Sequence, residues 1–172
     1  MKTHKTYLLT ALLFVFALVM APAALADKPG DSIVDIASGN ENFSTLVAAV
    51  VKADLVETLD GNRMFTVFAP TNDAFDAAAE AVLGTGNDGM DLVEALDEET
   101  LTAILLYHVA PGERFSEDVV NAQRIRMMNK DFTFVDGTTI VGNVSSADLV
   151  LDLIDIDARN GVIHVIDFVL LP

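Results

Sequence analysis

Apolar residues recur every three or four positions in the first half of the chain, as on one face of an amphipathic helix. This spacing predicts helices over residues 43–51 and 98–108. Two further helices are predicted from N-terminal capping residues, one that follows Ser32 and one that follows Thr71. The Gly-rich segment 83–90 is predicted to be a surface loop, because it lacks the Gly-Lys-Ser/Thr ending of a phosphate-binding loop.

Short runs of β-forming residues predict strands, most of them in the second half. Residues 64–69 are almost wholly apolar, which indicates a buried strand. The run 162–171 is apolar on both alternating faces, as in a central strand, and Asp167 would need a partner if it were buried there. Helices followed by strands indicate an α+β fold. Further strands are expected at 124–127, 132–135, 139–141 and 150–153, with turns at 129–131 and 136–137.

Composition narrows the possible functions. The chain has 172 residues, with 26 Asp and Glu against 10 Lys and Arg, and therefore a net charge of −16. Nucleic-acid binding relies on Lys and Arg meeting phosphate, so this balance argues against a nucleic-acid partner and against docking on an anionic membrane. The sequence contains no Cys, which excludes disulfides, zinc–thiolate sites and a Cys nucleophile.

The N-terminus has the features of a secretory signal peptide. Two Lys residues precede an uncharged apolar run, and Ala24-Leu25-Ala26 fits the small-residue rule for cleavage. We predict a signal peptide at 1–26 that is cleaved after Ala26, a short lead at 27–30 and one domain at 31–172. The mature chain would then be secreted or periplasmic and would contain no transmembrane segment.

Three stretches resemble, in order and spacing, those of a fasciclin-type domain. They are FTVFAPTNDAF (65–75), LLYHVAPG (105–112) and NGVIHVIDFVLLP (160–172). The resemblance covers residues 31–172. It implies a wedge of two small β-sheets with helices packed around it, in an exported single-domain protein of bacterial type. Within the motifs, we expect these residues to hold the fold: Thr66, Phe68, Pro70, Thr71, Asp73, Phe75, Asn160, Gly161, His164 and Asp167.

The resemblance also implies two candidate adhesion sites. The first is Tyr107 and His108, a pair that family members are said to use in adhesion. The helical spacing places His108 on the same face as Leu101 and Leu105, which favours a buried structural role. A hydrogen bond from His108 to a carboxylate such as Asp73 would fit that role.

The second candidate adhesion site is the pair Asp155 and Ile156. The resemblance to adhesive animal members implies integrin recognition at this place. A dipeptide is a weak motif, and the alternative is that Ile156 packs in the core while Asp155 is solvated. Together with Asp152 and Asp157, Asp155 favours a solvated acidic face over a calcium site, because the spacing differs from that of an EF-hand loop. We expect no metal and no cofactor.

Catalytic motifs are missing from the sequence. The chain after residue 26 has two histidines, and it contains neither a Gly-x-Ser-x-Gly elbow nor a His-Glu-x-x-His motif. We therefore predict that the protein is not an enzyme, because a nucleophile, a base and oxyanion donors must converge in one cleft.

The resulting hypothesis is an exported, non-catalytic interaction module. It would bind a cell-surface or matrix protein or carbohydrate. An alternative is a carrier of a small apolar ligand such as a lipid or pigment, with Met64, Met90, Met127 and Met128 lining the pocket. A third possibility is a role in the solubility or stress tolerance of the cell envelope.

Overall fold

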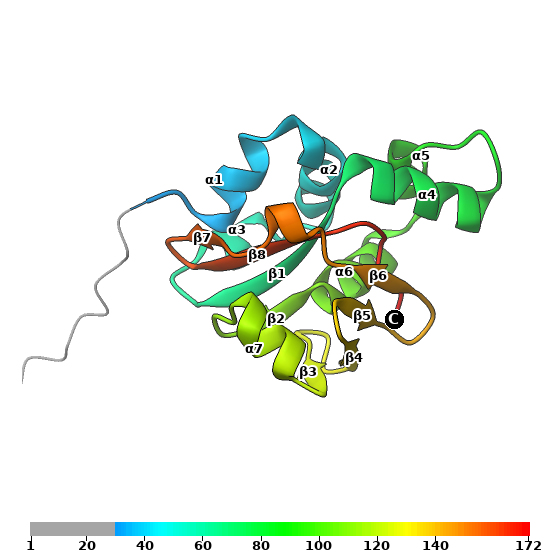
Figure 1. Cartoon of the computed structure of the whole chain (residues 1–172). Coiled ribbons are helices and arrows are strands. Elements are labelled where there is room, and N and C mark those ends of the chain that lie inside the picture. Colours follow the sequence, from blue (N-terminus) through cyan, green and yellow to red (C-terminus); the bar gives the residue numbers. More distant parts are fainter. Residues whose placement is uncertain (1–29) are drawn as a thin grey trace, which may run out of the picture.

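Two four-stranded sheets form the framework of residues 30–172, the part of the chain that the computed structural model describes (Figure 1). The predicted signal peptide and most of the predicted lead lie outside these residues. In the first sheet the strand order is β2-β1-β8-β7, and in the second it is β3-β4-β5-β6. The chain therefore has the predicted α+β architecture of two small sheets with helices.

The first sheet holds the two longest buried strands side by side. It consists of β1 (Phe65–Pro70), β2 (Val109–Pro111), β7 (Ile156–Ala158) and β8 (Gly161–Ile166). Strands β1 and β8 are parallel, and every residue of both is buried. This confirms a central strand at the C-terminal end, since β8 has a partner on each edge and apolar packing on each face. The strand is shorter than predicted, because it ends at Ile166 and residues 167–171 lie outside it.

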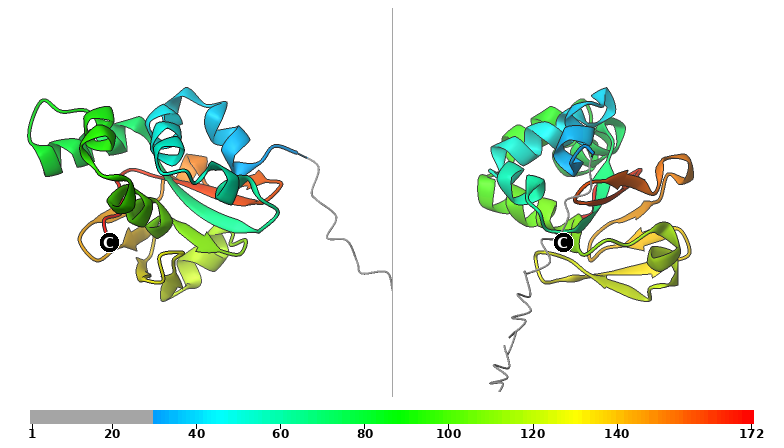
Figure 2. Two further views of the ribbon diagram at one scale, coloured as in Figure 1. Left: turned by 180° about the vertical axis from the view of Figure 1, so that it is seen from behind. Right: turned by 90° about the vertical axis from the view of Figure 1, so that its left-hand side faces the viewer.

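The second sheet is an antiparallel meander of β3 (Arg124–Arg126), β4 (Phe132–Asp136), β5 (Thr139–Val141) and β6 (Ser146–Asp148). Its turns agree with those predicted, because Lys130 and Gly137 adopt positive φ angles of 80° and 63°. The two sheets meet where Leu149 pairs with Ile166. Figure 2 shows them diverging from each other like the sides of a wedge.

Helices cover the first sheet on the side away from the second. Helices α1, α2, α4 and α5 lie there, while α7 lies beside the second sheet (Figure 1). Ser32 and Thr71 cap α1 and α4 as predicted, through hydrogen bonds from the backbone N–H groups of Asp35 and Ala74. The helices are α1 (Ile33–Ser38), η1 (Glu41–Phe43), α2 (Ser44–Lys52), α3 (Val56–Asp60), α4 (Asn72–Leu83), α5 (Gly89–Ala95), α6 (Glu98–Tyr107), α7 (Ser116–Asn121) and η2 (Leu151–Leu153).

The core is divided in two by the first sheet. One apolar cluster fills the space between the helices and this sheet and includes Val67 and Ile163. The other lies between the two sheets and includes Phe68, Ile140 and Ile166. Neighbouring residues of β1 thus serve different clusters, because side chains alternate between the faces of a strand.

Two predictions of local structure were wrong, and two short elements were not predicted. Residues 150–153 do not form a strand: Leu151–Leu153 is a 3-10 helix, and the strand lies earlier, at Ser146–Asp148. Gly89 and Met90, expected in a loop, begin α5, which Asp88 caps. Neither β2 nor α7 was predicted, since both are short and depend on partners far away in the sequence.

No helix within residues 30–172 is long and apolar enough to cross a membrane.

Candidate functional site

Tyr107 lies at the end of α6 with its side chain fully buried between the two sheets. Its hydroxyl group donates a hydrogen bond to the carbonyl oxygen of Phe132 and accepts one from the backbone N–H of Asn143, both at 3.1 Å. Burial is the main cause that raises the pKa of this hydroxyl. Tyr107 therefore joins α6 to the start of β4 and to the segment after β5. Its side chain presents no surface to a partner.

His108 follows directly and is also buried, with 2% of its surface exposed. Its Nδ1 atom lies 2.8 Å from the carbonyl oxygen of Ile104, and its Nε2 atom accepts a hydrogen bond from the N–H of Leu170 at 2.9 Å. These contacts assign a neutral ring with the proton on Nδ1. Burial lowers the pKa of His108 to about 4, although the hydrogen bond to Ile104 opposes this shift.

The suggested hydrogen bond between His108 and Asp73 does not form. Asp73 is exposed in the first turn of α4, where its charge favours the helix N-terminus. His108 instead binds two backbone groups, which satisfies both ring nitrogens without a carboxylate. The expectation that His108 faces the core is confirmed by its burial.

Asp155 and Ile156 form a corner where the chain enters β7. Asp155 has a positive φ of 57°. Its carboxylate accepts hydrogen bonds from the backbone N–H and the hydroxyl group of Ser116, at 2.6 and 2.5 Å. The carboxylate thus satisfies a free N–H at the start of α7 while its side chain stays 33% exposed. Ile156 is half-buried and packs against the first apolar cluster.

His164 supports this corner from the neighbouring strand β8. Its Nδ1 atom accepts a hydrogen bond from the N–H of Asp155 at 3.2 Å, and its Nε2 atom lies 2.8 Å from the carbonyl oxygen of Arg114. Burial lowers the pKa of His164, and the contacts with Arg114 and Asp155 oppose that effect. The ring is therefore a neutral link between β8, the corner and the segment that precedes α7.

The other residues of the three sequence motifs hold chain segments together. The Thr66 hydroxyl donates to the carbonyl oxygen of Gly112 and accepts from the N–H of Arg114. Phe68, Pro70 and Phe75 are buried. Asp167 is exposed rather than buried, and its carboxylate accepts a hydrogen bond from the N–H of Asp148 at 2.7 Å.

Asn160 and Gly161 form the turn between β7 and β8. The buried Asn160 amide accepts a hydrogen bond from the N–H of Ile33 and donates two, to the carbonyl oxygens of Leu59 and Gly61. Gly161 has a positive φ of 149°, and a Cβ atom there would lie 1.9 Å from the carbonyl oxygen of Phe65. Only glycine fits this position, because β1 passes too close for any side chain.

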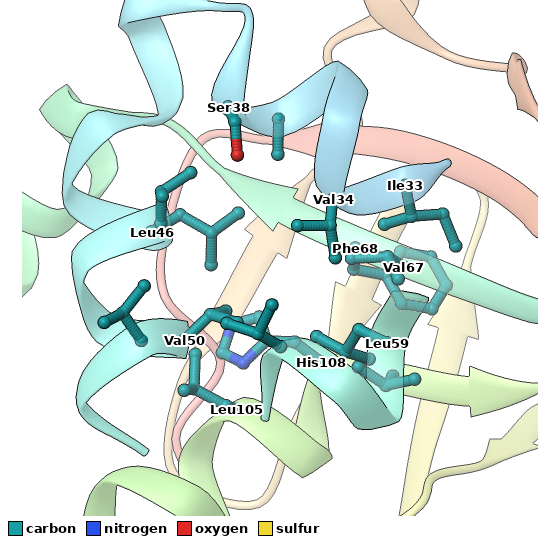
Figure 3. Close-up of a pocket in the computed structure, with 15 residues that line it drawn as sticks. Ile33, Val34, Ser38, Leu46, Val50, Leu59, Val67, Phe68, Leu105 and His108 are labelled. Carbon is teal, nitrogen blue, oxygen red and sulfur yellow. The ribbon is translucent and has the colours of Figure 1, made fainter. Parts of the chain in front are cut away.

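An apolar pocket of about 140 Å³ lies beside His108, between α1, α2, α3 and β1. Figure 3 shows Ile33, Leu46, Val50 and Leu59 around it. Ser38 and His108 are its polar lining residues, and both ring nitrogens of His108 are engaged with the backbone. None of the four methionines considered as pocket-lining residues lines this pocket.

Within residues 30–172, no group of three or more His, Asp or Glu side chains is placed to hold a metal ion. Of the acidic residues 152, 155 and 157, Asp155 directs its carboxylate to Ser116.

Comparison with known proteins identifies the family. The profile of the family described as "Fasciclin domain" matches residues 41–172, which is most of the chain. The chain belongs to the fasciclin domain family. This confirms the resemblance that the three sequence motifs indicated.

The fasciclin domain has bacterial relatives. It is similar to Protein sll1483 of Synechocystis, with 43% identity over 82% of this chain and 73% of that protein. It is also similar to the cell surface glycolipoprotein MPB83 of Mycobacterium bovis, with 31% identity over 88% of this chain and 65% of the relative. The second relative is thus named for a place at the cell surface.

A solved structure shares the fold of this fasciclin domain. The FAS1 domain pair of the insect cell adhesion molecule Fasciclin I matches with a TM-score of 0.68 and 17% identity. The match covers 83% of this chain and 51% of that one, as expected when one domain is compared with a pair.

The sequence did not reveal the residues that hold the corner of this fasciclin domain in place. Ser116 and Arg114 contact Asp155 and His164 across 39 and 50 residues. Ser116 begins a short helix without a clear periodic pattern, and Arg114 contributes only its backbone carbonyl group. Neither residue could be recognised without knowing that the segment from Arg114 to Ser116 lies near β8.

Proposed function

We propose that the protein is an exported, non-catalytic interaction module that binds a cell-surface or extracellular-matrix partner, either a protein or a carbohydrate. Membership of the fasciclin domain family supports this, as do a relative named for the cell surface and a structural neighbour from a cell adhesion molecule. Export follows from the predicted signal peptide at residues 1–26, which would leave one domain at 31–172.

The observation that carries the proposal is the difference in exposure between the two candidate sites. Tyr107 and His108 are buried, whereas the Asp155 side chain is 33% exposed. Exposed large apolar side chains lie near this corner along the chain: Leu151 and Leu153 precede it, and Phe115 adjoins Ser116, which binds Asp155. Exposed apolar side chains that are rimmed by polar groups mark interaction sites on protein surfaces.

The proposal assigns different roles to the two sites. The corner at Asp155 and Ile156 contacts the partner directly. Tyr107 and His108 position the sheets and the C-terminal segment. A non-catalytic role agrees with the contacts of His108 and His164, whose ring nitrogens are all bound to backbone groups.

Cell attachment to the immobilised protein tests the proposal. The protein is compared with an Asp155→Ala variant and a Tyr107→Phe variant, and circular dichroism confirms that each is folded. We expect attachment to be lost in Asp155→Ala and kept in Tyr107→Phe. Absence of attachment to the unmodified protein would contradict the proposal.

A matched control separates contact from folding at the corner. Ser116→Ala removes one hydrogen bond to Asp155 but leaves the Asp155 carboxylate in place. If Asp155 contacts the partner, Ser116→Ala keeps most of the attachment while Asp155→Ala loses it. Equal loss in both variants would assign the effect to local structure instead.

A second candidate function is the binding of a small apolar molecule, which the pocket beside His108 favours. A dry apolar cavity of about 150 Å³ is large enough for a benzene-sized group. Native mass spectrometry of the protein from its host should then reveal a bound molecule. A Val50→Phe variant, which fills the pocket, should lose it, whereas the exposed control Val82→Phe should retain it. A protein that carries only its own mass would contradict this function.

A further inference from the structure

The outward face of the second sheet combines two arginines with two exposed phenylalanines. Arg124 and Arg126 of β3 and Phe132 and Phe134 of β4 point away from the core, whereas Ile125 lies buried between the arginines. Phe134 is 52% exposed and Phe132 is 37% exposed. Exposed apolar side chains that are grouped on one face and rimmed by polar residues mark interaction sites, so this face is a candidate docking surface.

The strand register arranges these side chains in alternation. Arg126 lies opposite Phe132, and Arg124 lies opposite Phe134, which has Val141 on its other side. The Arg124 guanidinium also lies over the Phe132 ring, 4.8 Å from its centroid. One aromatic ring, that of Phe134, therefore remains open between a cation and an apolar side chain.

The positive charge of this face is not neutralised locally. Within residues 30–172, neither Arg124 nor Arg126 forms an ion pair with a carboxylate. The acidic residues of the same face are Asp136 and Asp148. They lie opposite Thr139 on the two neighbouring strands, and the Thr139 hydroxyl group donates a hydrogen bond to Asp148. The face thus has a basic, aromatic half and an acidic end.

The partner must satisfy both the local and the overall charge. Two free guanidinium groups favour carboxylates, which they bind through paired hydrogen bonds. A net charge of −16 repels a dense polyanion such as nucleic acid or a heavily sulfated chain. Carboxylates that are spaced apart along a ligand meet both conditions. They can pair with the arginines, while salt screens their repulsion from the acidic remainder of the protein beyond about 8 Å. The apolar C–H face of a sugar ring between them would pack on the exposed ring of Phe134.

The geometry points to a glycan that carries uronic acids spaced among neutral sugars as the ligand of the face formed by Arg124, Arg126, Phe132 and Phe134. This inference rests on the proposed function, since it names a partner class and a second contact surface for the same interaction module. The sugar ring packs on Phe134, and the arginines bind the carboxylates on either side.

Hyaluronan oligosaccharides are a suitable probe, because every second sugar carries a carboxylate. Isothermal titration calorimetry would compare them with the carboxyl-reduced polymer and with heparin. We expect the protein to bind hyaluronan. Its affinity for the carboxyl-reduced polymer and for heparin should be lower by about tenfold or more. Absence of binding to hyaluronan, or equal affinity for the reduced polymer, would overturn the inference.

Variants localise the binding to this face. Arg126→Gln and Phe134→Thr should each raise the dissociation constant by about fivefold or more, and both side chains are exposed enough to change without disturbing the core. Arg63→Gln removes the same charge from an exposed position outside the sheets and should leave the affinity unchanged. An equal effect of Arg63→Gln would assign the binding to net charge and overturn the assignment.

The cell-attachment assay separates this inference from the proposed function. If hyaluronan does not bind but attachment persists and depends on Asp155, the glycan inference fails and the proposed function stands. If the protein neither attaches to cells nor binds hyaluronan, both fail. Attachment that weakens in both Asp155→Ala and Phe134→Thr supports the two together.

Discussion

The Nε2 atom of His108 accepts a hydrogen bond from the backbone N–H of Leu170 across 2.9 Å. The two residues are 62 positions apart in the chain, and both are buried. The bond ties the C-terminal segment to the end of α6. It requires an unprotonated ring, because a protonated Nε2 atom would have a proton where the N–H of Leu170 now points.

Stability should therefore fall as the solution becomes acidic. The pKa of His108 is lowered from 6.5 to about 4 by burial, so the unfolded chain binds more protons than the folded chain between these values. The stabilisation is fully present above pH 6.5 and is lost as the pH falls towards 4. Between pH 7 and pH 5 the free energy of unfolding should drop by about 2 kcal/mol, measured by urea denaturation.

A His108→Asn variant checks the origin of this pH dependence. It should be less stable at pH 7 and should lose less stability between pH 7 and pH 5 than the unmodified protein. The remaining slope would come from His164, whose pKa is lowered in the same direction. A variant with the full slope would show that His108 is not the group responsible.

Replacing Asn160 should weaken the attachment of α1 to the first sheet. Asn160→Ala leaves the N–H of Ile33 and the carbonyl oxygens of Leu59 and Gly61 without their partner. We expect a loss of about 2–4 kcal/mol in the free energy of unfolding, since buried polar groups without hydrogen bonds are costly. The exposed control Asn62→Ala should change it by about 0.5 kcal/mol at most. Similar losses in both would contradict the role of Asn160.

Gly161→Ala should prevent folding or destabilise the protein severely. The added Cβ atom would collide with the backbone of Phe65, and no side chain can move to relieve the contact. Gly137→Ala is a matched control, because its φ is also positive while its surroundings are open. It should cost about 1 kcal/mol. Soluble yield and thermal midpoint would distinguish the two, and a stable Gly161→Ala protein would refute the close approach of β1.

Tyr107→Phe should lower stability but keep attachment to cells. The variant removes the hydroxyl group that bonds to Phe132 and Asn143, at a cost of about 1–3 kcal/mol. Urea denaturation and the attachment assay measure the two effects separately. Loss of attachment with unchanged stability would mean that Tyr107 contacts the partner directly.

Much of the fold could be predicted where a signal is local. The Ser32 and Thr71 caps bind N–H groups three residues away, so the helix starts were recognisable from short motifs. The strand at 146–148 was missed because Ala147 is buried only when this strand pairs with β5, where Ala147 lies opposite Ile140. The predicted strand at 150–153 was wrong because Leu151 and Leu153 are apolar yet exposed.

The sequence by itself determined the family, the α+β class and the burial of β1 and β8, including the inward orientation of His108. Periodicity and motif order suffice for these properties, because they are set by neighbours along the chain. Only the tertiary structure decided which polar atoms meet: Asp155 with Ser116, His108 with Leu170 and Asn160 with Ile33. Such contacts join segments that burial of apolar surface brings together, and no local spacing encodes which donor then faces which acceptor.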